Sequence, residues 1–202
     1  MSGLPLLVKD TIDVIGAALG LLALAPLFAV LAVLVKRSSP GPVFYRWRVV
    51  GRGGRPFTGY KFRTMVADAD ARKAGLLARN EMSGPMFKMA DDPRVTPLGR
   101  TLRRYSLDEL PQLWSVLVGD MSLVGPRPPL QTEWARFEPW QRRKLAVRPG
   151  ITCLWQVQGR NAIRDFDDWV RLDLEYIDSW SLWLDLRILG QTLRAVVRGT
   201  GR

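Results

Sequence analysis

The 202-residue chain contains no histidine and a single cysteine, Cys153. The missing histidine excludes a Ser-His-Asp triad, a histidine general base and a histidine-ligated zinc site. A lone cysteine excludes an intramolecular disulfide and a thiolate zinc cluster, and it fits a reducing compartment. Catalysis would therefore have to rest on carboxylates, arginines, lysines, hydroxyls or a hard metal ion bound through oxygen.

Lysine is also scarce, with 6 residues against 24 arginines, and the formal net charge is +11. Arginine carries a planar fork of donors that pairs with phosphate at two points. With 47% apolar residues the chain has enough apolar surface to fold. The basic excess then indicates a polyanionic partner, which is nucleic acid, anionic lipid or a phosphorylated substrate.

Two common phosphate-binding signatures are missing. The chain has no Gly-x-x-x-x-Gly-Lys loop and no Gly-x-Gly-x-x-Gly after a strand, which disfavours P-loop and dinucleotide-binding folds. Asp68-Ala69-Asp70 matches the short Asp-x-Asp signature of nucleotide-sugar glycosyltransferases, although a solvated charged helix is the simpler interpretation. Asp91-Asp92-Pro93 is typical of a turn.

One long hydrophobic run is present, the 22 uncharged residues from Val14 to Val35. A straight helix of that length reaches about 33 Å, enough to cross the hydrocarbon core of a bilayer. Pro26 lies near its middle, where a proline kinks a helix and leaves a carbonyl without its partner. The residues alone leave two topologies open, a spanning helix or a bent hairpin that enters and leaves on one face.

The rest of the chain predicts an α+β fold that is mainly helical. Aromatic and β-branched runs at Val43–Val50 and Phe57–Phe62 flank a glycine-rich turn and predict a small β-hairpin. Residues 66–95 predict a short helix and then a loop. Further helices are expected over residues 97–104, 110–118, 133–147, 165–180 and 182–197. Tryptophans in arginine-containing stretches, namely Trp134, Trp140, Trp180 and Trp183, suit amphipathic helices at a membrane interface.

The Asp108-Glu109 pair is the first candidate for chemistry. Ser106 to Glu109 matches a capping box, so the pair has a purely structural explanation. Arginines lie just upstream, and Arg127 follows in the proline-rich loop Gly125–Pro129. Carboxylates at a helix start among arginines are well placed to meet a phosphate, a metal ion or both.

Six segments together resemble the bacterial sugar transferases, the monotopic phosphoglycosyl transferases, in the order that the family has them. They are Tyr60–Met65, Ser106–Leu113, Gly119–Ser122, Gly125–Pro128, Arg148–Thr152 and Gln156–Asn161. The resemblance covers nearly the whole chain and includes the proline-broken hydrophobic segment. It implies transfer of a sugar-1-phosphate from a UDP-sugar to polyprenol (undecaprenyl) phosphate, with release of UMP.

The same resemblance implies roles for individual residues. Asp108 would be the nucleophile of a covalent aspartyl-phosphosugar intermediate, and Asp108 and Glu109 would hold a Mg²⁺ cofactor. The substrate phosphates would be bound by Lys61, Arg63, Arg103, Arg127 and Arg148. The nucleotide sugar, or the loop around it, would be contacted by Gln156, Arg160 and Asn161.

The family pattern also implies an organisation. Residues 1–37 would form a re-entrant membrane segment, and residues 38–202 would form one catalytic domain on the cytoplasmic face of the bacterial inner membrane. Expected partners are UDP-sugar, polyprenol phosphate and membrane lipid, without nucleic acid, and a homodimer stays open. The chain departs from the pattern at Ala25, where some members have serine, and at Asp10, where a second basic residue can stand. Met82–Val95 resembles longer members, so the chain is either a short form or a truncated one.

Two other functions compete with this one. A metal-dependent glycosyltransferase using Asp68 and Asp70 would transfer the sugar without its phosphate and release UDP rather than UMP. A basic, membrane-anchored nucleic-acid binder would show steeply salt-dependent duplex binding, but no nucleic-acid recognition motif supports it.

Overall fold

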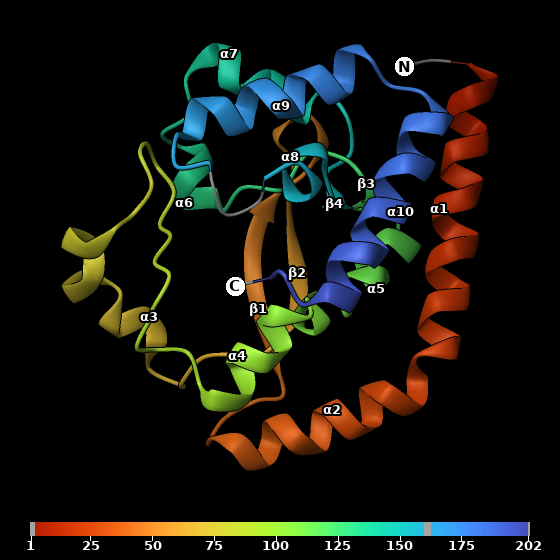
Figure 1. Cartoon of the computed structure of the whole chain (residues 1–202). Coiled ribbons are helices and arrows are strands. Elements are labelled where there is room, and N and C mark those ends of the chain that lie inside the picture. The colour runs from red at the N-terminus through yellow and green to blue at the C-terminus, as the bar shows by residue number, and fades with distance from the viewer. Residues whose placement is uncertain (1–2, 160–162, 202) are drawn as a thin grey trace.

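The hydrophobic run forms two helices rather than one. The computed structural model describes residues 3–159 and 163–201, and in it α1 (Leu4–Ala23) and α2 (Ala25–Ser38) meet at a bend of 62° (Figure 1). Pro26 stands in the first turn of α2, where its missing N–H costs little, so the predicted break is confirmed. No single helix among the described residues has the length and composition of a membrane span, whereas the bent pair passes that test together.

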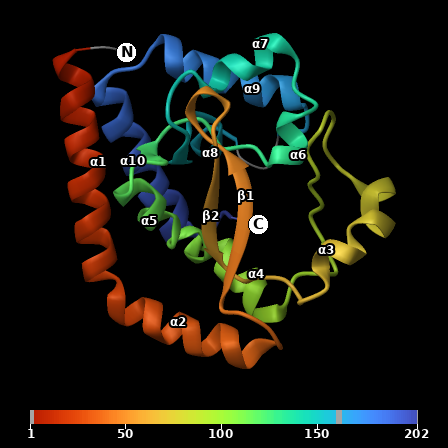
Figure 2. The ribbon, with the colours of Figure 1, turned by 180° about the vertical axis from the view of Figure 1, so that it is seen from behind.

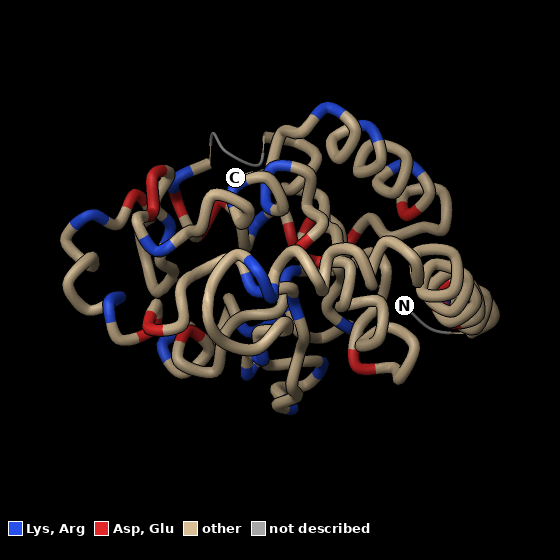
Figure 3. Tube along the Cα trace, turned by 90° about the horizontal axis from the view of Figure 1, so that it is seen from below, with Lys and Arg blue, Asp and Glu red and all other residues tan. Residues whose placement is uncertain are grey.

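α1 lies along one edge of the molecule and α2 turns beneath it (Figure 2). Ala17 of α1 packs on Val116 and Met121, while the outer face leaves large apolar side chains exposed, such as Leu4 and Leu22. Seen from below, α1 is viewed along its axis and its tube is mostly tan (Figure 3). Lys9 is buried, and its ammonium group donates to Asp185 at 2.7 Å. A buried ion pair therefore helps to join α1 to the body of the protein.

The predicted β-hairpin is confirmed. β1 (Phe44–Val50) and β2 (Pro56–Phe62) pair antiparallel around the 3₁₀ turn η1 (Arg52–Gly54). At its lower end Phe62 is buried in a cluster with Leu31 and Val35 of α2 and Leu102 of α4 (Pro97–Arg104). This cluster fixes the hairpin between α2 and α4.

Several predicted helices form as expected. Thr96 caps α4 by accepting the N–H of Gly99 at 2.9 Å. The stretch after the hairpin contains α3 (Ala69–Arg72), the 3₁₀ helix η2 (Ala74–Arg79) and then a loop. The two C-terminal helices are α9 (Phe166–Asp178) and α10 (Leu182–Arg198).

Two helix predictions need correction. The predicted helix over residues 133–147 is wrong, because that stretch consists of α6 (Gln131–Trp134), α7 (Pro139–Arg142) and the 3₁₀ turn η4 (Arg143–Leu145). Pro139 starts a new helix, α7, within that stretch. Each short helix has its own N-terminal cap, because the Leu130 N–H donates to Glu133 and the Glu138 N–H donates to Gln141, both at 2.8 Å.

The expected capping box at Ser106 does not form. Ser106 has a left-handed backbone (φ 53°) and no side-chain capping hydrogen bond, so a 3₁₀ turn, η3 (Leu107–Glu109), follows it. α5 (Gln112–Leu117) begins only after Pro111 and is shorter than the predicted helix. Asp108 and Glu109 therefore lie in a tight turn before α5 and not in its first turn.

The sequence patterns do not predict the second sheet. β3 (Ser122–Val124) and β4 (Gly150–Thr152) pair in parallel, and α8 (Leu154–Val157) follows β4. The strands approach so closely at Gly150 that a Cβ there would lie 2.0 Å from the Gly125 nitrogen. Strands of three residues leave too short a hydrophobic pattern to detect in sequence.

Candidate functional site

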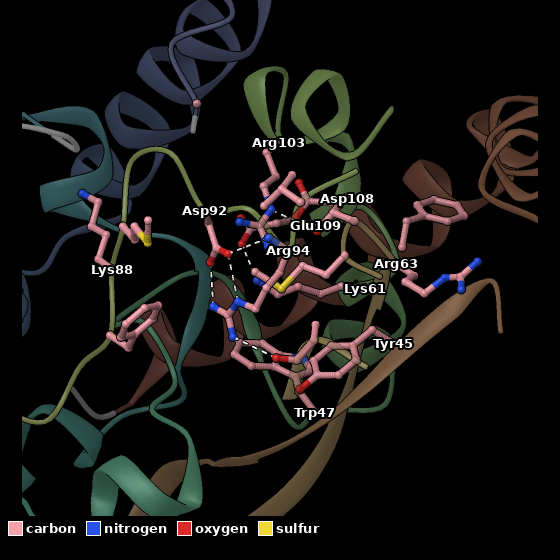
Figure 4. Close-up of a pocket in the computed structure, with 18 of the residues that line it drawn as sticks. Tyr45, Trp47, Lys61, Arg63, Lys88, Asp92, Arg94, Arg103, Asp108 and Glu109 are labelled. Carbon is pink, nitrogen blue, oxygen red and sulfur yellow. Dashed lines mark hydrogen bonds and ion pairs between the residues drawn. The ribbon is translucent and has the colours of Figure 1, made fainter. Parts of the chain in front are cut away.

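A cavity of about 1390 Å³ lies beside the hairpin. Its walls come from β1, β2, α4, η3, the loop around Arg127, the segment before α4, and α8. Figure 4 shows charged side chains from several of these elements pointing toward one another. Segments far apart in sequence thus place charged side chains around the same cavity.

The two carboxylates of η3 form one wall of this cavity. Asp108 and Glu109 are each only 8% exposed. A 3₁₀ helix has three residues per turn, so their side chains leave the backbone about 120° apart. Glu109 accepts a hydrogen bond from the Lys61 ammonium group at 2.5 Å, and the Arg127 guanidinium lies 3.6 Å from the same oxygen. Adjacent carboxylates therefore have different surroundings and are suited to different roles.

Lys61 reaches this site from β2. Its ammonium group lies 4.3 Å from the ring centre of Trp47, which stands on the paired strand β1. Burial lowers the pKa of Lys61, and the neighbouring Glu109 charge partly opposes that effect. The ion pair keeps a cation directly beside the carboxylates.

Arg103 reaches the site from α4. Its Nε donates to Thr64 Oγ1 at 2.9 Å, and α4 can come this close because a Cβ at Gly99 would lie 2.1 Å from the Thr64 carbonyl oxygen. Burial lowers the pKa of Arg103, while the charge of Asp108 raises it. Arg103 is therefore held by its hydrogen bond to Thr64 and also interacts electrostatically with the Asp108 carboxylate.

The loop that carries Arg127 is fastened at several points. The Gly125 N–H donates to Thr152, the Gly150 N–H to Pro126 and the Val50 N–H to Pro129, each at 3.0 Å. Prolines on both sides of Arg127 restrict the backbone further. Arg127 therefore approaches Glu109 from a rigid support, with its side chain still 29% exposed.

Two other predicted arginines make their contacts away from the carboxylates of Asp108 and Glu109. Arg63 is a cavity-wall residue, yet its guanidinium turns away from the carboxylates (Figure 4). It donates to the carbonyl of Val35 in α2 and to those of Ser39 and Pro40, which follow α2. Arg148 is not among the described cavity-lining residues and instead pairs with Asp10 of α1 at 2.7 Å. The guanidinium groups of both arginines are therefore engaged with α1 or with the C-terminal end of α2 and the residues that follow it, while their predicted binding of substrate phosphate stays a prediction.

Three residues are predicted to contact the nucleotide sugar, and the structure describes one of them. Gln156 of α8 is buried and lines the cavity. Arg160 and Asn161 lie outside the described residues.

The sequence patterns do not identify several residues of the cavity. The Arg94 guanidinium makes two hydrogen bonds to the Asp92 carboxylate, at 2.6 and 2.9 Å, and both residues are buried in the cavity wall. The motif that contains Asp92 predicts only a turn. The hydrogen-bonded Arg94 guanidinium lowers the pKa of Asp92. An acidic residue two positions before an arginine is the available signal, but it is too common in sequences to identify a site.

The two alternative acidic residues, Asp68 and Asp70, have different surroundings. Asp68 is exposed and forms an i,i+4 ion pair with Arg72 at 2.8 Å, while Asp70 lines the cavity. In the part of the chain that the structure describes, no three aspartate, glutamate or cysteine side chains gather as a metal site. A hard cation at this cavity would take the carboxylates of Asp108 and Glu109 and complete its shell with water or substrate oxygens.

Comparisons with known proteins identify the family to which this chain belongs. The family model of the bacterial sugar transferases matches residues 4–199. "Galactosyl transferase CpsE" of Streptococcus agalactiae is 48% identical over 196 residues, covering 97% of this chain and 43% of that protein. "Undecaprenyl-phosphate galactose phosphotransferase" of Salmonella typhimurium is 42% identical over 197 residues, covering 96% of this chain and 41% of that protein.

A third relative has a length closer to that of this chain. "Exopolysaccharide production protein ExoY" of Sinorhizobium fredii is 41% identical over 197 residues, covering 96% of this chain and 87% of that protein. The chain thus spans about two fifths of the first two relatives and most of the third. On the family match and this coverage, the chain belongs to the bacterial sugar transferase family.

Proposed function

We propose that this chain is a phosphoglycosyl transferase that moves a sugar-1-phosphate from a UDP-sugar to polyprenol phosphate and releases UMP. The reaction would be a first membrane step in the assembly of a polysaccharide or glycoconjugate. The observation that carries the proposal is the juxtaposition of Asp108 and Glu109 with Lys61, Arg103 and Arg127 in one cavity. The relatives' names, which mention galactose transfer and undecaprenyl phosphate, support the same reaction class.

The chemistry follows from the residue types. A carboxylate oxygen of Asp108 attacks the phosphorus that bears the sugar, and the bond from that phosphorus to the bridging oxygen breaks as UMP leaves. An oxygen of the polyprenol phosphate then attacks the same phosphorus, and the carboxylate leaves. Lys61, Arg103 and Arg127 offset the charge that develops on the moving group. The acceptor is already mostly ionised near neutral pH, so no histidine base is required.

Mg²⁺ is the cofactor in this proposal. The ion typically takes one or two protein carboxylates and fills its shell with water and substrate phosphate oxygens. The adjacent carboxylates of Asp108 and Glu109 fit that requirement and would hold it. When bound, Mg²⁺ would neutralise part of the diphosphate charge.

The proposed place of reaction is the cytoplasmic face of the bacterial inner membrane. The exposed apolar side chains of α1 and the bend at Pro26 support a segment that enters and leaves the bilayer on one side. There a soluble nucleotide sugar can meet a lipid acceptor.

Product analysis tests the reaction. Purified protein is incubated with a panel of UDP-sugars, undecaprenyl phosphate and Mg²⁺, and the nucleotide products are separated. We expect UMP and lipid-linked sugar diphosphate with at least one donor, and loss of both after chelation by EDTA. Release of UDP in place of UMP would instead support the glycosyltransferase that uses Asp68 and Asp70.

Cysteine labelling tests the topology. Ser2→Cys and Ser38→Cys variants, each with Cys153→Ala, are treated with a membrane-impermeant maleimide. Both sites should be protected in sealed cells and should react after permeabilisation, because a bent segment returns to the side it entered. Labelling of Ser2→Cys in sealed cells with protection of Ser38→Cys would show a spanning segment.

A further inference from the structure

α4 presents two different faces. Leu98 and Leu102 pack against the apolar cluster that contains Leu31 and Val35 of α2. Arginines on α4 line the cavity, and they are Arg100, Arg103 and Arg104. Figures 1 and 2 both show α4 lying against α2. α4 therefore contacts both the proposed membrane segment and the cavity.

The three arginines of α4 are not equivalent. Arg103 is partly buried and bound to Thr64, whereas Arg100 and Arg104 are exposed. Arg100 and Arg104 are one helical turn apart, so their side chains lie on the same side of α4. Across residues 3–159 and 163–201, neither forms an ion pair with a carboxylate, in contrast to Arg94 with Asp92 or Lys61 with Glu109.

The end of α10 holds this part of α4 in place. Gly199 ends α10 in a left-handed conformation, and the Gly201 N–H then donates to the Arg104 carbonyl at 2.9 Å. The segment 199–201 also lines the cavity beside the arginines. Arg100 and Arg104 therefore extend from a helix whose C-terminal turn is fixed from outside.

The proposed reaction brings two different phosphates to one carboxylate in turn. Lys61, Arg103 and Arg127 lie around Asp108 and Glu109, where the donor diphosphate has to be. The acceptor comes from the bilayer, and so from the side of α2. We propose that Arg100 and Arg104 form the subsite for the phosphate monoester of the polyprenol acceptor. This inference rests on the proposed function and assigns its second substrate to residues separate from those of the first.

The two steps of the reaction allow a direct test. The double variant Arg100→Gln/Arg104→Gln is compared with the wild type in nonionic detergent, which removes bulk attraction to anionic lipid. Three quantities are measured: the KM for undecaprenyl phosphate, the KM for the UDP-sugar, and the exchange of labelled UMP into UDP-sugar without acceptor. Arg52→Gln/Arg55→Gln is the matched control, because both arginines are exposed in the hairpin turn and do not line the cavity.

We expect the acceptor KM to rise about tenfold to hundredfold, the range for lost hydrogen bonds to a charged group. The donor KM and the UMP exchange should stay within about twofold of the wild type, and the control should change nothing. Arg100→Lys/Arg104→Lys should recover part of the loss, because charge is kept while the two-point contact is lost. Inorganic phosphate should compete only weakly with the acceptor in the wild type, because it lacks the lipid tail.

Three results would overturn the assignment. An unchanged acceptor KM would remove both arginines from the acceptor site. Equal losses in exchange and transfer would place them in donor binding or in the fold. An equal effect of the control pair would show a general charge effect. Failure of the wild type to transfer sugar phosphate at all would instead overturn the proposed function, so the two failures are distinguishable.

Discussion

Asp108→Asn is expected to lower the rate of UMP release by at least about 10⁴-fold, the scale seen when a catalytic nucleophile is removed. The substitution keeps the size of a residue that is only 8% exposed, but it removes the negative charge that attacks phosphorus in the proposed reaction. Glu109 cannot simply replace it, because its carboxylate is engaged by Lys61 at 2.5 Å and its side chain leaves the turn in another direction.

Intact-protein mass spectrometry provides the deciding measurement. Wild-type protein given UDP-sugar without acceptor should gain the mass of one sugar phosphate and should exchange labelled UMP into the donor. Asp108→Asn should do neither, while its circular dichroism and melting temperature stay close to those of the wild type. An adduct on Asp108→Asn, or exchange at the wild-type rate, would make Glu109 the candidate nucleophile.

Arg127→Ala is expected to reduce kcat/KM by at least about 10²-fold, which is the usual effect of removing a group that stabilises transition-state charge. The loop around Arg127 is fastened by hydrogen bonds to both β4 and the hairpin. Its guanidinium therefore needs little reorganisation to meet a phosphate.

Steady-state kinetics with the preferred UDP-sugar measure this effect, and Arg127→Lys serves as the matched comparison. Lysine keeps the charge, but it loses the planar fork and should recover only part of the activity. If Arg127→Ala is folded and has wild-type kcat/KM, then Arg127 has only a structural role beside Glu109.

The sequence predicted part of the group of charged residues that lines the cavity. Asp108, Glu109, Lys61, Arg103 and Arg127 were all expected at the site, and the structure brings all five to one cavity. Arg63 and Arg148 belong to segments that resemble the family. The Arg63 guanidinium, however, donates to carbonyl groups at the end of α2, and the Arg148 guanidinium pairs with Asp10 of α1. An arginine has the same chemistry in either position, so the residue type could not show which guanidinium groups lie beside the carboxylates and which bind α1 or α2.

Local chemistry by itself determined the bend at Pro26, the hairpin around the glycine-rich turn, and the α4 helix capped by Thr96. Each depends on residues a few positions apart, and a missing N–H, a turn or a cap hydrogen bond acts within that range. Composition likewise excluded histidine chemistry, because the chain contains no histidine at all.

Only the tertiary structure decided which polar groups meet. The parallel pair of β3 and β4, the burial of Lys9 against Asp185, and the placement of the α4 arginines along the cavity all join residues distant in sequence. The predicted helix over residues 133–147 was wrong for a related reason. The composition of that stretch did not show that Glu133 and Gln141 would each cap the start of a separate short helix. Contacts between distant segments depend on packing, and packing is not encoded in any one stretch of the chain.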